Sequence, residues 1–213
     1  MALASMHQPR FDAVVFDLLT ALLDSWTVWN RAAGSDTDGL RWRRAYLRLT
    51  YGCGAYRPYE ELVREAARST GFQPGVADAL TRTWGELQPW AEAPAILGDL
   101  ARRGVPLGVA TNCSVSMGNQ AALAVGVPFT AVVTSEEAGF YKPRPEPYRA
   151  VLARLGTDPA RTLFVAGSPA DVPGATAIGM PVFWHNRAGL PFVADGARPF
   201  LVADTLQPLL ELA

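Results

Sequence analysis

Acidic side chains beside apolar runs are the first candidates for chemistry in this chain. Asp17 directly follows the apolar run 13–16. An apolar run next to a charge is typical of a central parallel strand whose carboxyl end opens on a site. A buried acid is costly unless it is paired or used, which favours Asp17 as a nucleophile. The alternative is a helix cap, because Asp is a preferred capping residue.

Further polar side chains follow the later apolar runs. In chain order they are Thr111, Asn112, Lys142, Ser168 and Asp171. The carboxyl ends of parallel strands meet at one edge of a sheet, where open α/β folds bind their ligands. Each of these residues alone also fits a helix cap, a turn or a solvated surface position. The ordered set, rather than any single member, therefore predicts a site.

The elements that must position these residues fall into two parts. Residues 24–92 contain no strand-like run and carry helical patterns at 40–51, 59–70 and 77–84. From Pro94 onwards helices and strands alternate, which predicts βαβ units and a mostly parallel sheet. The expected class is α/β. The expected domains are a core at 1–23, a helical insert at 24–92 and the core again at 93–213.

The alternating part predicts specific elements. Strands are expected at 105–110, 131–134, 162–166 and 181–184, and helices at 95–103, 115–125, 145–155 and 175–178. The strand at 181–184 is expected to be the last one. Aromatic residues are concentrated in the insert, where they form either a lid over a site or an ordinary core. The four tryptophans of the insert are Trp26, Trp29, Trp42 and Trp84.

Composition narrows the class of protein. The chain has 213 residues, of which 49% are hydrophobic and 18% charged, as expected for a globular protein with a real core. A net charge of -1 favours neither a nucleic acid nor an anionic membrane as partner. The two cysteines and two histidines form no metal motif. The first ten residues lack the apolar core of a signal peptide, so a cytoplasmic protein is expected.

The ordered motifs resemble those of the haloacid dehalogenase superfamily of hydrolases, over nearly the whole chain. The first is the apolar strand that ends at Asp17, and the second is Thr111 with Asn112. The third is Lys142 in YKPRPEPY, and the fourth is the stretch 167–175 after an apolar strand. The resemblance implies a Rossmann-like parallel sheet core with a small helical cap inserted after the first strand.

Two positions bear on which reaction the resemblance implies. Phosphatases of this superfamily carry a second Asp two residues after the nucleophile, which acts as general acid, and this chain has Leu19 there. They also usually carry an acid at the position of Gly167, which helps Asp171 to hold Mg²⁺. The loss of both acids argues against ordinary phosphoryl transfer. Magnesium is therefore expected only if the chain is a phosphatase after all.

The remaining pattern resembles the 2-haloacid dehalogenase branch. Arg43 matches a substrate-binding arginine on a cap helix, and Tyr148 stands six residues after Lys142, as in that branch. The stretch 184–189, WHNRAG, resembles the closing W-x-N-R-x-G of the branch. For Arg43 the alternative is a solvated helix face, because arginines surround it in the sequence.

The resemblance implies a chemistry that needs neither metal nor cofactor. Asp17 displaces halide from the substrate carbon and forms an aspartyl ester. Lys142 keeps Asp17 ionised, because a neighbouring cation lowers the pKa of a carboxylate. Leu19 is tolerable because halide leaves without a proton, and it helps to exclude water. Asp171, with Ser168 nearby, positions or deprotonates the water that hydrolyses the ester.

Substrate binding is implied at the same edge. Thr111 and Asn112 hold the substrate carboxylate, while Arg43 adds charge from the cap and takes up the departing halide. Tyr148 belongs to the same substrate-binding set. The expected partner is a small haloacid or similar carboxylate. Relatives of this kind are commonly dimers, so a homodimer is a further expectation.

The chain also departs from the pattern, which leaves three functions open. The family normally has Gly-Thr where this chain has Thr20 and Ala21, so the hydroxyl expected four residues after Asp17 is absent. Ala166 and Ser168 stand where the branch tends to have Ser and Asn. The open functions are a metal-independent 2-haloacid hydrolase, a hydrolase of the same fold on another substrate such as a phosphate ester, and a non-catalytic binding protein.

Overall fold

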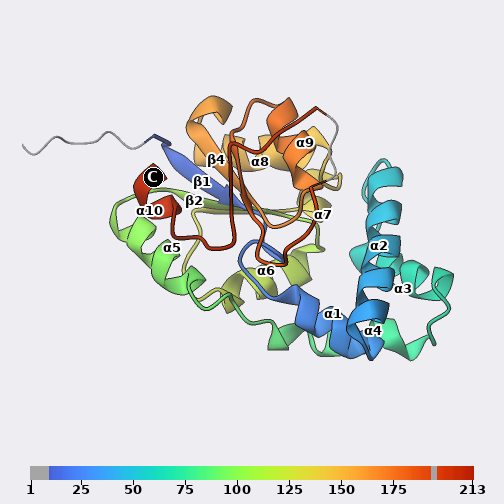
Figure 1. Cartoon of the computed structure of the whole chain (residues 1–213). Coiled ribbons are helices and arrows are strands. Elements are labelled where there is room, and N and C mark those ends of the chain that lie inside the picture. The colour runs from blue at the N-terminus through green and yellow to red at the C-terminus, as the bar shows by residue number, and fades with distance from the viewer. Residues whose placement is uncertain (1–9, 193–195) are drawn as a thin grey trace, which may run out of the picture.

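A six-stranded parallel sheet forms the centre of the molecule (Figure 1). The computed structural model describes residues 10–192 and 196–213. The strand order is β3-β2-β1-β4-β5-β6, which confirms the expected α/β class with a parallel sheet. The strands are β1 (Ala13–Phe16), β2 (Leu107–Thr111), β3 (Ala131–Thr134), β4 (Thr162–Ala166), β5 (Val182–His185) and β6 (Leu201–Ala203).

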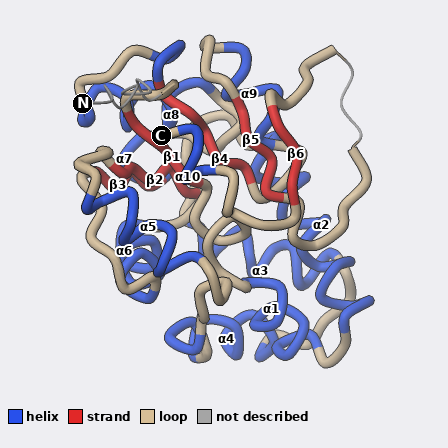
Figure 2. Tube along the Cα trace, turned by 60° about the vertical axis from the view of Figure 1, so that its left-hand side comes forward, coloured by secondary structure: helices blue, strands red, loops and turns tan. Residues whose placement is uncertain are grey.

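Strand β1 is buried on both faces, because helices cover the two sides of the sheet. Val14 and Phe16 point into the cluster that contains residues of α5 (Ala93–Arg102) and α6 (Val115–Ala124). Val15 points into the opposite cluster, against α8 (Pro145–Leu155) and α9 (Asp171–Ala177). Shorter helices complete the shell: α7 (Ser135–Ala138) and α10 (Leu209–Leu212), both labelled in Figure 2, and η2 (Pro159–Arg161).

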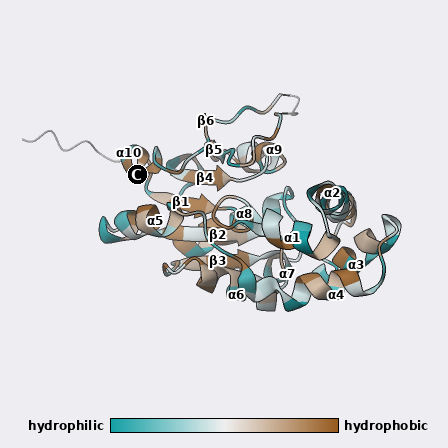
Figure 3. Cartoon of the chain, turned by 60° about the horizontal axis from the view of Figure 1, so that its bottom comes forward, coloured by the Kyte–Doolittle hydropathy of each residue, from teal (hydrophilic) through white to brown (hydrophobic). Residues whose placement is uncertain are grey.

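A group of four helices lies beside the carboxyl ends of the strands (Figures 1 and 3). These are α1 (Ser25–Ala33), α2 (Asp36–Gly52), α3 (Tyr59–Ser69) and α4 (Gly75–Arg82), followed by the short η1 (Trp84–Glu86). Their interior is aromatic, with Trp29 and Trp42 ring centroids 4.6 Å apart and Tyr46 and Tyr59 centroids 5.4 Å apart. Aromatic pairs in this range bury large areas and attract one another through their ring edges.

The chain enters and leaves this helical group at adjacent points. Leu23 and Pro89 form an isolated antiparallel bridge. The amide of Asp24 donates to the carbonyl of Gln88 at 2.8 Å, and the amide of Trp90 donates to the carbonyl of Leu22 at 2.9 Å. The two connections are therefore one short paired ribbon.

Several expected elements differ from those observed. The prediction that 181–184 is the last strand is wrong, because β6 follows at the sheet edge with partly exposed side chains and no buried apolar run. Helix α1 was not expected. The helix expected at 175–178 begins at Asp171 instead, since Pro173 is tolerated in a first turn, where its missing N–H has no helical acceptor.

Two further expectations concern a membrane-spanning helix and a signal peptide. Among the described helices, none is both long and apolar enough to cross a bilayer. The expectation about a signal peptide, and His7 with it, concerns residues 1–9, which lie outside the described residues.

Candidate functional site

A small cavity lies where the helical group meets the carboxyl ends of the strands. Its volume is about 60 Å³. From the sheet side it is lined by Asp17, Leu19, Thr20, Asn112, Lys142, Ser168 and Asp171. From α1, α2 and α3 it is lined by Trp26, Trp29, Arg43, Tyr46, Leu47, Tyr51 and Tyr59. Seven of the nine site residues expected from sequence therefore line one cavity; Thr111 and Tyr148 do not.

Asp17 and Asp171 share one buried ammonium. Lys142 Nζ lies 2.8 Å from Asp17 Oδ1 and 3.1 Å from Asp171 Oδ2, and the lysine is 1% exposed. Burial alone would raise the pKa of Asp17. The charge and hydrogen bond of Lys142, together with two hydrogen bonds from Thr20, hold that pKa below its ordinary value. Burial raises the pKa of Asp171 to about 6. The two carboxylates thus differ in acidity, with Asp17 the more firmly ionised.

The second oxygen of Asp17 is held by the loop that follows β1. Asp17 Oδ2 accepts hydrogen bonds from the Thr20 hydroxyl at 2.6 Å, the Thr20 amide at 2.9 Å and the Ala21 amide at 3.2 Å. Thr20 therefore supplies the hydroxyl that seemed to be missing from the first motif. Oδ1 has Lys142 as its hydrogen-bond donor among the described residues.

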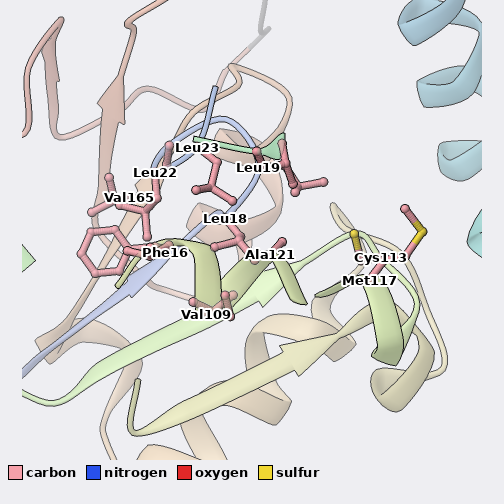
Figure 4. Close-up of a cluster of buried hydrophobic side chains, with 14 of the residues drawn as sticks. Phe16, Leu18, Leu19, Leu22, Leu23, Val109, Cys113, Met117, Ala121 and Val165 are labelled. Atoms are coloured by element: carbon pink, nitrogen blue, oxygen red, sulfur yellow. The ribbon is translucent and has the colours of Figure 1, made fainter. Parts of the chain in front are cut away.

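This loop is fixed from both sides. Its carbonyls are bound by ring donors, with Trp90 Nε1 3.1 Å from the Thr20 oxygen and His185 Nδ1 2.8 Å from the Ala21 oxygen. Beneath it, Leu18 and Leu22 are fully buried, and Figure 4 shows them with Phe16 and Val165 in the core cluster. The peptide groups that hold Asp17 are therefore preorganised by packing and hydrogen bonds.

Gly167 packs against the same loop without room for a side chain. A Cβ at this position would lie 2.2 Å from the Ala21 nitrogen and 2.4 Å from the Thr20 hydroxyl oxygen. Real Cβ atoms essentially never come this close to such atoms. An acidic side chain at 167 is therefore incompatible with the observed position of Thr20.

Asn112 clamps the backbone of Lys142. Its Oδ1 accepts from the Lys142 amide at 2.8 Å and from the Ser135 hydroxyl at 2.8 Å, while its Nδ2 donates to the Lys142 carbonyl at 3.1 Å. Both lone pairs of the amide oxygen are then used. Thr111 is fully buried at the end of β2, and its hydroxyl has no hydrogen-bond partner among the described residues.

Arg43 is buried on α2, so it does not lie on a solvated helix face. It is 7% exposed and its guanidinium carbon lies 4.1 Å from the centroid of the Trp26 ring. Its Nη2 donates to the Ser25 hydroxyl at 2.8 Å, and that hydroxyl donates to the Leu19 carbonyl. Burial lowers the pKa of Arg43, and within the described part of the chain no carboxylate forms an ion pair with it.

Ser168 and Tyr148 occupy different places around Asp171. Ser168 lines the cavity, and its hydroxyl accepts from the Ala170 amide at 3.3 Å. Tyr148 is fully buried behind the site, with its hydroxyl 3.4 Å from Asp171 Oδ1. Tyr148 therefore contacts Asp171 rather than the cavity.

The aromatic wall of the cavity was not assigned from sequence. Trp26, Trp29, Tyr46, Tyr51 and Tyr59 all line it. The concentration of tryptophans in the insert was the available signal, although Trp42 and Trp84 do not line the cavity and an ordinary core explained the enrichment equally well.

The donor set does not fit a magnesium ion held as the phosphatase pattern requires. Across the described residues, no group of three or more His, Cys, Asp or Glu side chains could hold a metal. The two carboxylates of the cavity are bridged by the Lys142 ammonium, and Gly167 has no space for an acid. Magnesium prefers six oxygen ligands in octahedral geometry.

Comparison with known proteins assigns the chain to a family. The profile of the haloacid dehalogenase-like hydrolases matches residues 11–179. Haloacetate dehalogenase H-2 of Moraxella sp. strain B is 29% identical over 95% of this chain and 98% of that protein. An (S)-2-haloacid dehalogenase of Pseudomonas sp. strain YL is 29% identical over 93% of each chain. A phosphoserine phosphatase of Thermus thermophilus is 28% identical over 85% of this chain and 77% of its own.

Solved structures share the fold. An L-2-haloacid dehalogenase is 26% identical, with a TM-score of 0.84 over 94% of this chain and 97% of that one. The L-2-haloacid dehalogenase of Xanthobacter autotrophicus, 23% identical, superimposes with a TM-score of 0.80 over 93% of this chain and 96% of that one. With the profile match across most of its length, this chain belongs to the haloacid dehalogenase-like hydrolases.

Proposed function

We propose that this hydrolase removes halide from small 2-haloacids through an ester of Asp17. One observation carries the proposal: Asp17, held ionised by Lys142, lies at the same cavity as Arg43, which is buried and has no acidic partner among residues 10–192 and 196–213. A buried arginine without a carboxylate is costly unless an anion binds it. The haloacid dehalogenases among the relatives support this assignment.

In the first step, Asp17 attacks the substrate carbon that bears the halogen. Its Oδ1 forms the new carbon–oxygen bond, because Oδ2 is occupied by the three donors of Thr20 and Ala21. The carbon–halogen bond breaks, and halide leaves with the bonding electrons. Halide needs no proton to leave, so the apolar Leu19 can stand where a phosphatase needs an acid. The product of this step is an aspartyl ester.

In the second step, water hydrolyses the ester. Asp171 accepts a proton from water as the water oxygen attacks the Asp17 carboxyl carbon. The bond between that carbon and the ester oxygen then breaks. The ester oxygen leaves with the product and takes the proton held by Asp171, which gives a 2-hydroxyacid. The second proton of the water passes to solvent, which restores Asp17 as a carboxylate. With a pKa of about 6, Asp171 is ionised at neutral pH and can accept this proton.

The other residues position these groups or bind the substrate. Asn112 holds the backbone of Lys142, and Tyr148 orients Asp171 from behind. Arg43 binds an anionic end of the substrate and takes up the departing halide, while Ser168 lies beside the water site. Direct binding of the substrate carboxylate by Thr111 and Asn112 stays a prediction.

The α1–α4 group, within residues 24–92, acts as a cap over the cavity in this proposal. It supplies Arg43 and the aromatic wall, while the flanking segments supply the nucleophile and its partners. The reaction written above uses no metal and no cofactor. A small carboxylate is the proposed partner, a homodimer stays a prediction, and a cytoplasmic location remains part of the proposal.

The test is halide release from L- and D-2-chloropropionate, with and without EDTA. We expect release that EDTA does not affect and that Asp17→Asn abolishes. The phosphatase relative makes Mg²⁺-dependent hydrolysis of phosphate esters the second candidate. Loss of activity in EDTA, with phosphate release restored by Mg²⁺, would establish that candidate instead. No turnover of either class by folded protein would favour a binding protein.

A further inference from the structure

Within the described part of the chain, three buried hydrogen-bond donors that have no partner belong to side chains lining the cavity that contains Asp17. They are Nη1 of Arg43, Nε1 of Trp29 and the hydroxyl of Tyr59. Arg43 is 7% exposed, and Trp29 and Tyr59 are 1% exposed. Buried donors in native proteins are nearly always paired, so an unpaired group calls for an explanation. Three of them around one cavity indicate a shared ligand.

Comparable groups elsewhere in the same helical region are paired. The indole of Trp42 donates to the Val63 carbonyl at 3.0 Å, and that of Trp84 donates to the Met117 carbonyl at 2.9 Å. Neither tryptophan lines the cavity. Within the helical group, the fold therefore satisfies the buried indoles of Trp42 and Trp84 and leaves that of Trp29, beside the cavity, without a partner among the described residues; outside the group, the buried indole of Trp184 in β5 is also unpaired.

The chemistry of the three groups defines the ligand. Guanidinium and indole groups donate hydrogen bonds and cannot accept them. Burial holds the pKa of Tyr59 well above its ordinary value, so its hydroxyl keeps the proton and can donate. Ser25 occupies Nη2 of Arg43 and leaves Nη1 available. A ligand that accepts from all three and neutralises the arginine is a small anion.

We propose that Trp29 and Tyr59 complete, with Arg43, an anion-binding site in the wall formed by α1, α2 and α3. Its ligand is a monovalent anion that only accepts hydrogen bonds, either a carboxylate or a halide. The inference rests on the proposed function for the source of that anion, namely the substrate or the leaving group. The guanidinium carbon of Arg43 lies 5.6 Å from the Trp29 ring centroid, so the charge and the indole are neighbours.

The decisive variant is Tyr59→Phe, which removes only the hydroxyl. Thermal unfolding of the wild type and the variant is followed over a series of sodium bromide concentrations and, separately, of sodium acetate. We expect one or both salts to raise the wild-type midpoint, and Tyr59→Phe to weaken the apparent anion affinity by about 10-fold. Without the anion its midpoint stays the same or rises, because an unpaired buried donor has been removed.

Matched variants separate this role from a structural one. Tyr141→Phe removes a hydroxyl that donates to the Arg57 carbonyl at 2.8 Å, so its midpoint should fall while its anion affinity stays unchanged. Trp29→Phe should weaken anion binding, whereas Trp84→Phe, with an equal loss of ring volume, should only destabilise. Stabilisation by bromide alone assigns the site to the halide, and by acetate alone to the carboxylate.

The inference is overturned if neither anion stabilises the wild type, or if Tyr59→Phe keeps the wild-type response. It is also overturned if Tyr59→Phe lowers the midpoint as Tyr141→Phe does, since the hydroxyl would then be structural. Halide release distinguishes this failure from that of the proposed function. If the protein binds an anion through Tyr59 but releases no halide, the proposed dehalogenation is wrong and the anion-binding site stands.

Discussion

Gly167 lies directly against Thr20, and the backbone of the turn at Thr20 and Ala21 occupies the space that a side chain at 167 would need. A Cβ at 167 would lie 2.2 Å from the Thr20 carbonyl carbon and from the Ala21 nitrogen, and 2.4 Å from the Thr20 hydroxyl oxygen, which itself lies 2.6 Å from Asp17 Oδ2. Two departures from the family pattern, one in the first motif and one in the fourth, are therefore in direct contact. The close approach of this turn requires glycine at 167.

This close approach makes Gly167→Ala severely disruptive. We expect it to reduce the free energy of unfolding by about 1–3 kcal/mol through overpacking, and to reduce halide release with it. Gly98→Ala is the control, because Gly98 lies in α5 with open space around it and should be neutral or slightly stabilising. In a Thr20→Gly background most of the cost of Gly167→Ala should remain, because the two nearest atoms to the added Cβ, each at 2.2 Å, belong to the backbone of Thr20 and Ala21; loss of most of that cost would contradict this. Urea unfolding measures the wild type, the three single variants and the double variant.

The hydroxyl of Thr20 stabilises the ionised form of Asp17. Thr20→Val should raise the pKa of Asp17, because it removes the 2.6 Å bond from Oδ2. A hydrogen bond to a charged group contributes about 1.5–3 kcal/mol, so kcat should fall about 10- to 100-fold. Thr20→Ser keeps the hydroxyl and should retain most of the activity. Equal loss in both variants would show that the hydroxyl alone does not account for the effect.

The pH dependence of activity should reflect Asp171. Its pKa of about 6, raised by burial, predicts that ester hydrolysis declines as the pH falls below about 6, since protonated Asp171 cannot accept a proton from water. The measurement is kcat as a function of pH, with single-turnover halide release to separate the two steps. If only the rate of halide release falls at low pH, protonation of Asp17 rather than of Asp171 is responsible.

The contribution of Asp171 to the stability of the protein should change with pH in the direction opposite to its contribution to kcat. Its folded pKa lies above the ordinary value of 3.8, so its contribution to stability is complete below that value and is lost as the pH rises through about 6. Asp171→Asn should therefore gain about 1–3 kcal/mol relative to wild type between pH 4 and pH 7. Urea unfolding at both pH values checks this. A constant difference would mean that Lys142 compensates the buried charge fully.

Ser25 should act on substrate binding through Arg43. Ser25→Ala removes the acceptor of Arg43 Nη2 and is expected to raise KM about 10-fold, with a smaller change in kcat. In an Arg43→Lys background the same change should have little further effect. Thr50→Ala, which deletes a buried hydroxyl on α2, the helix that carries Arg43, controls for general destabilisation of the helical group. Additive effects of Ser25→Ala and Arg43→Lys on KM would show that Ser25 does not act through Arg43.

The sequence predicted the central architecture because burial patterns are local. The run 13–16, the strands 131–134 and 162–166 and the helix 145–155 agree with the structure residue for residue. An uninterrupted apolar run between turn residues is enough to indicate a buried strand. Edge strand β6 has three partly exposed residues and offers no such pattern.

The polar contacts of the site were harder to predict, since they depend on loop conformation and on contacts between distant residues. Spacing alone placed Thr20 one position too early to serve Asp17, yet the turn after β1 brings its hydroxyl to 2.6 Å. The clamp of Asn112 on Lys142 joins residues 30 positions apart. Arg43 and Ser25, likewise, meet only because α1 and α2 pack together.

The paired ribbon at Leu23 and Pro89 has a mechanical consequence for the helices it connects. The amides of Asp24 and Trp90 join the two connecting segments, so the chain passes into and out of the helical group at one place, while the bridge between Ala55 and Phe140 fixes the group at a second place. Because both crossings are adjacent, the whole helical group could be exchanged for that of another family member as a cassette, provided that the ribbon is transplanted with it.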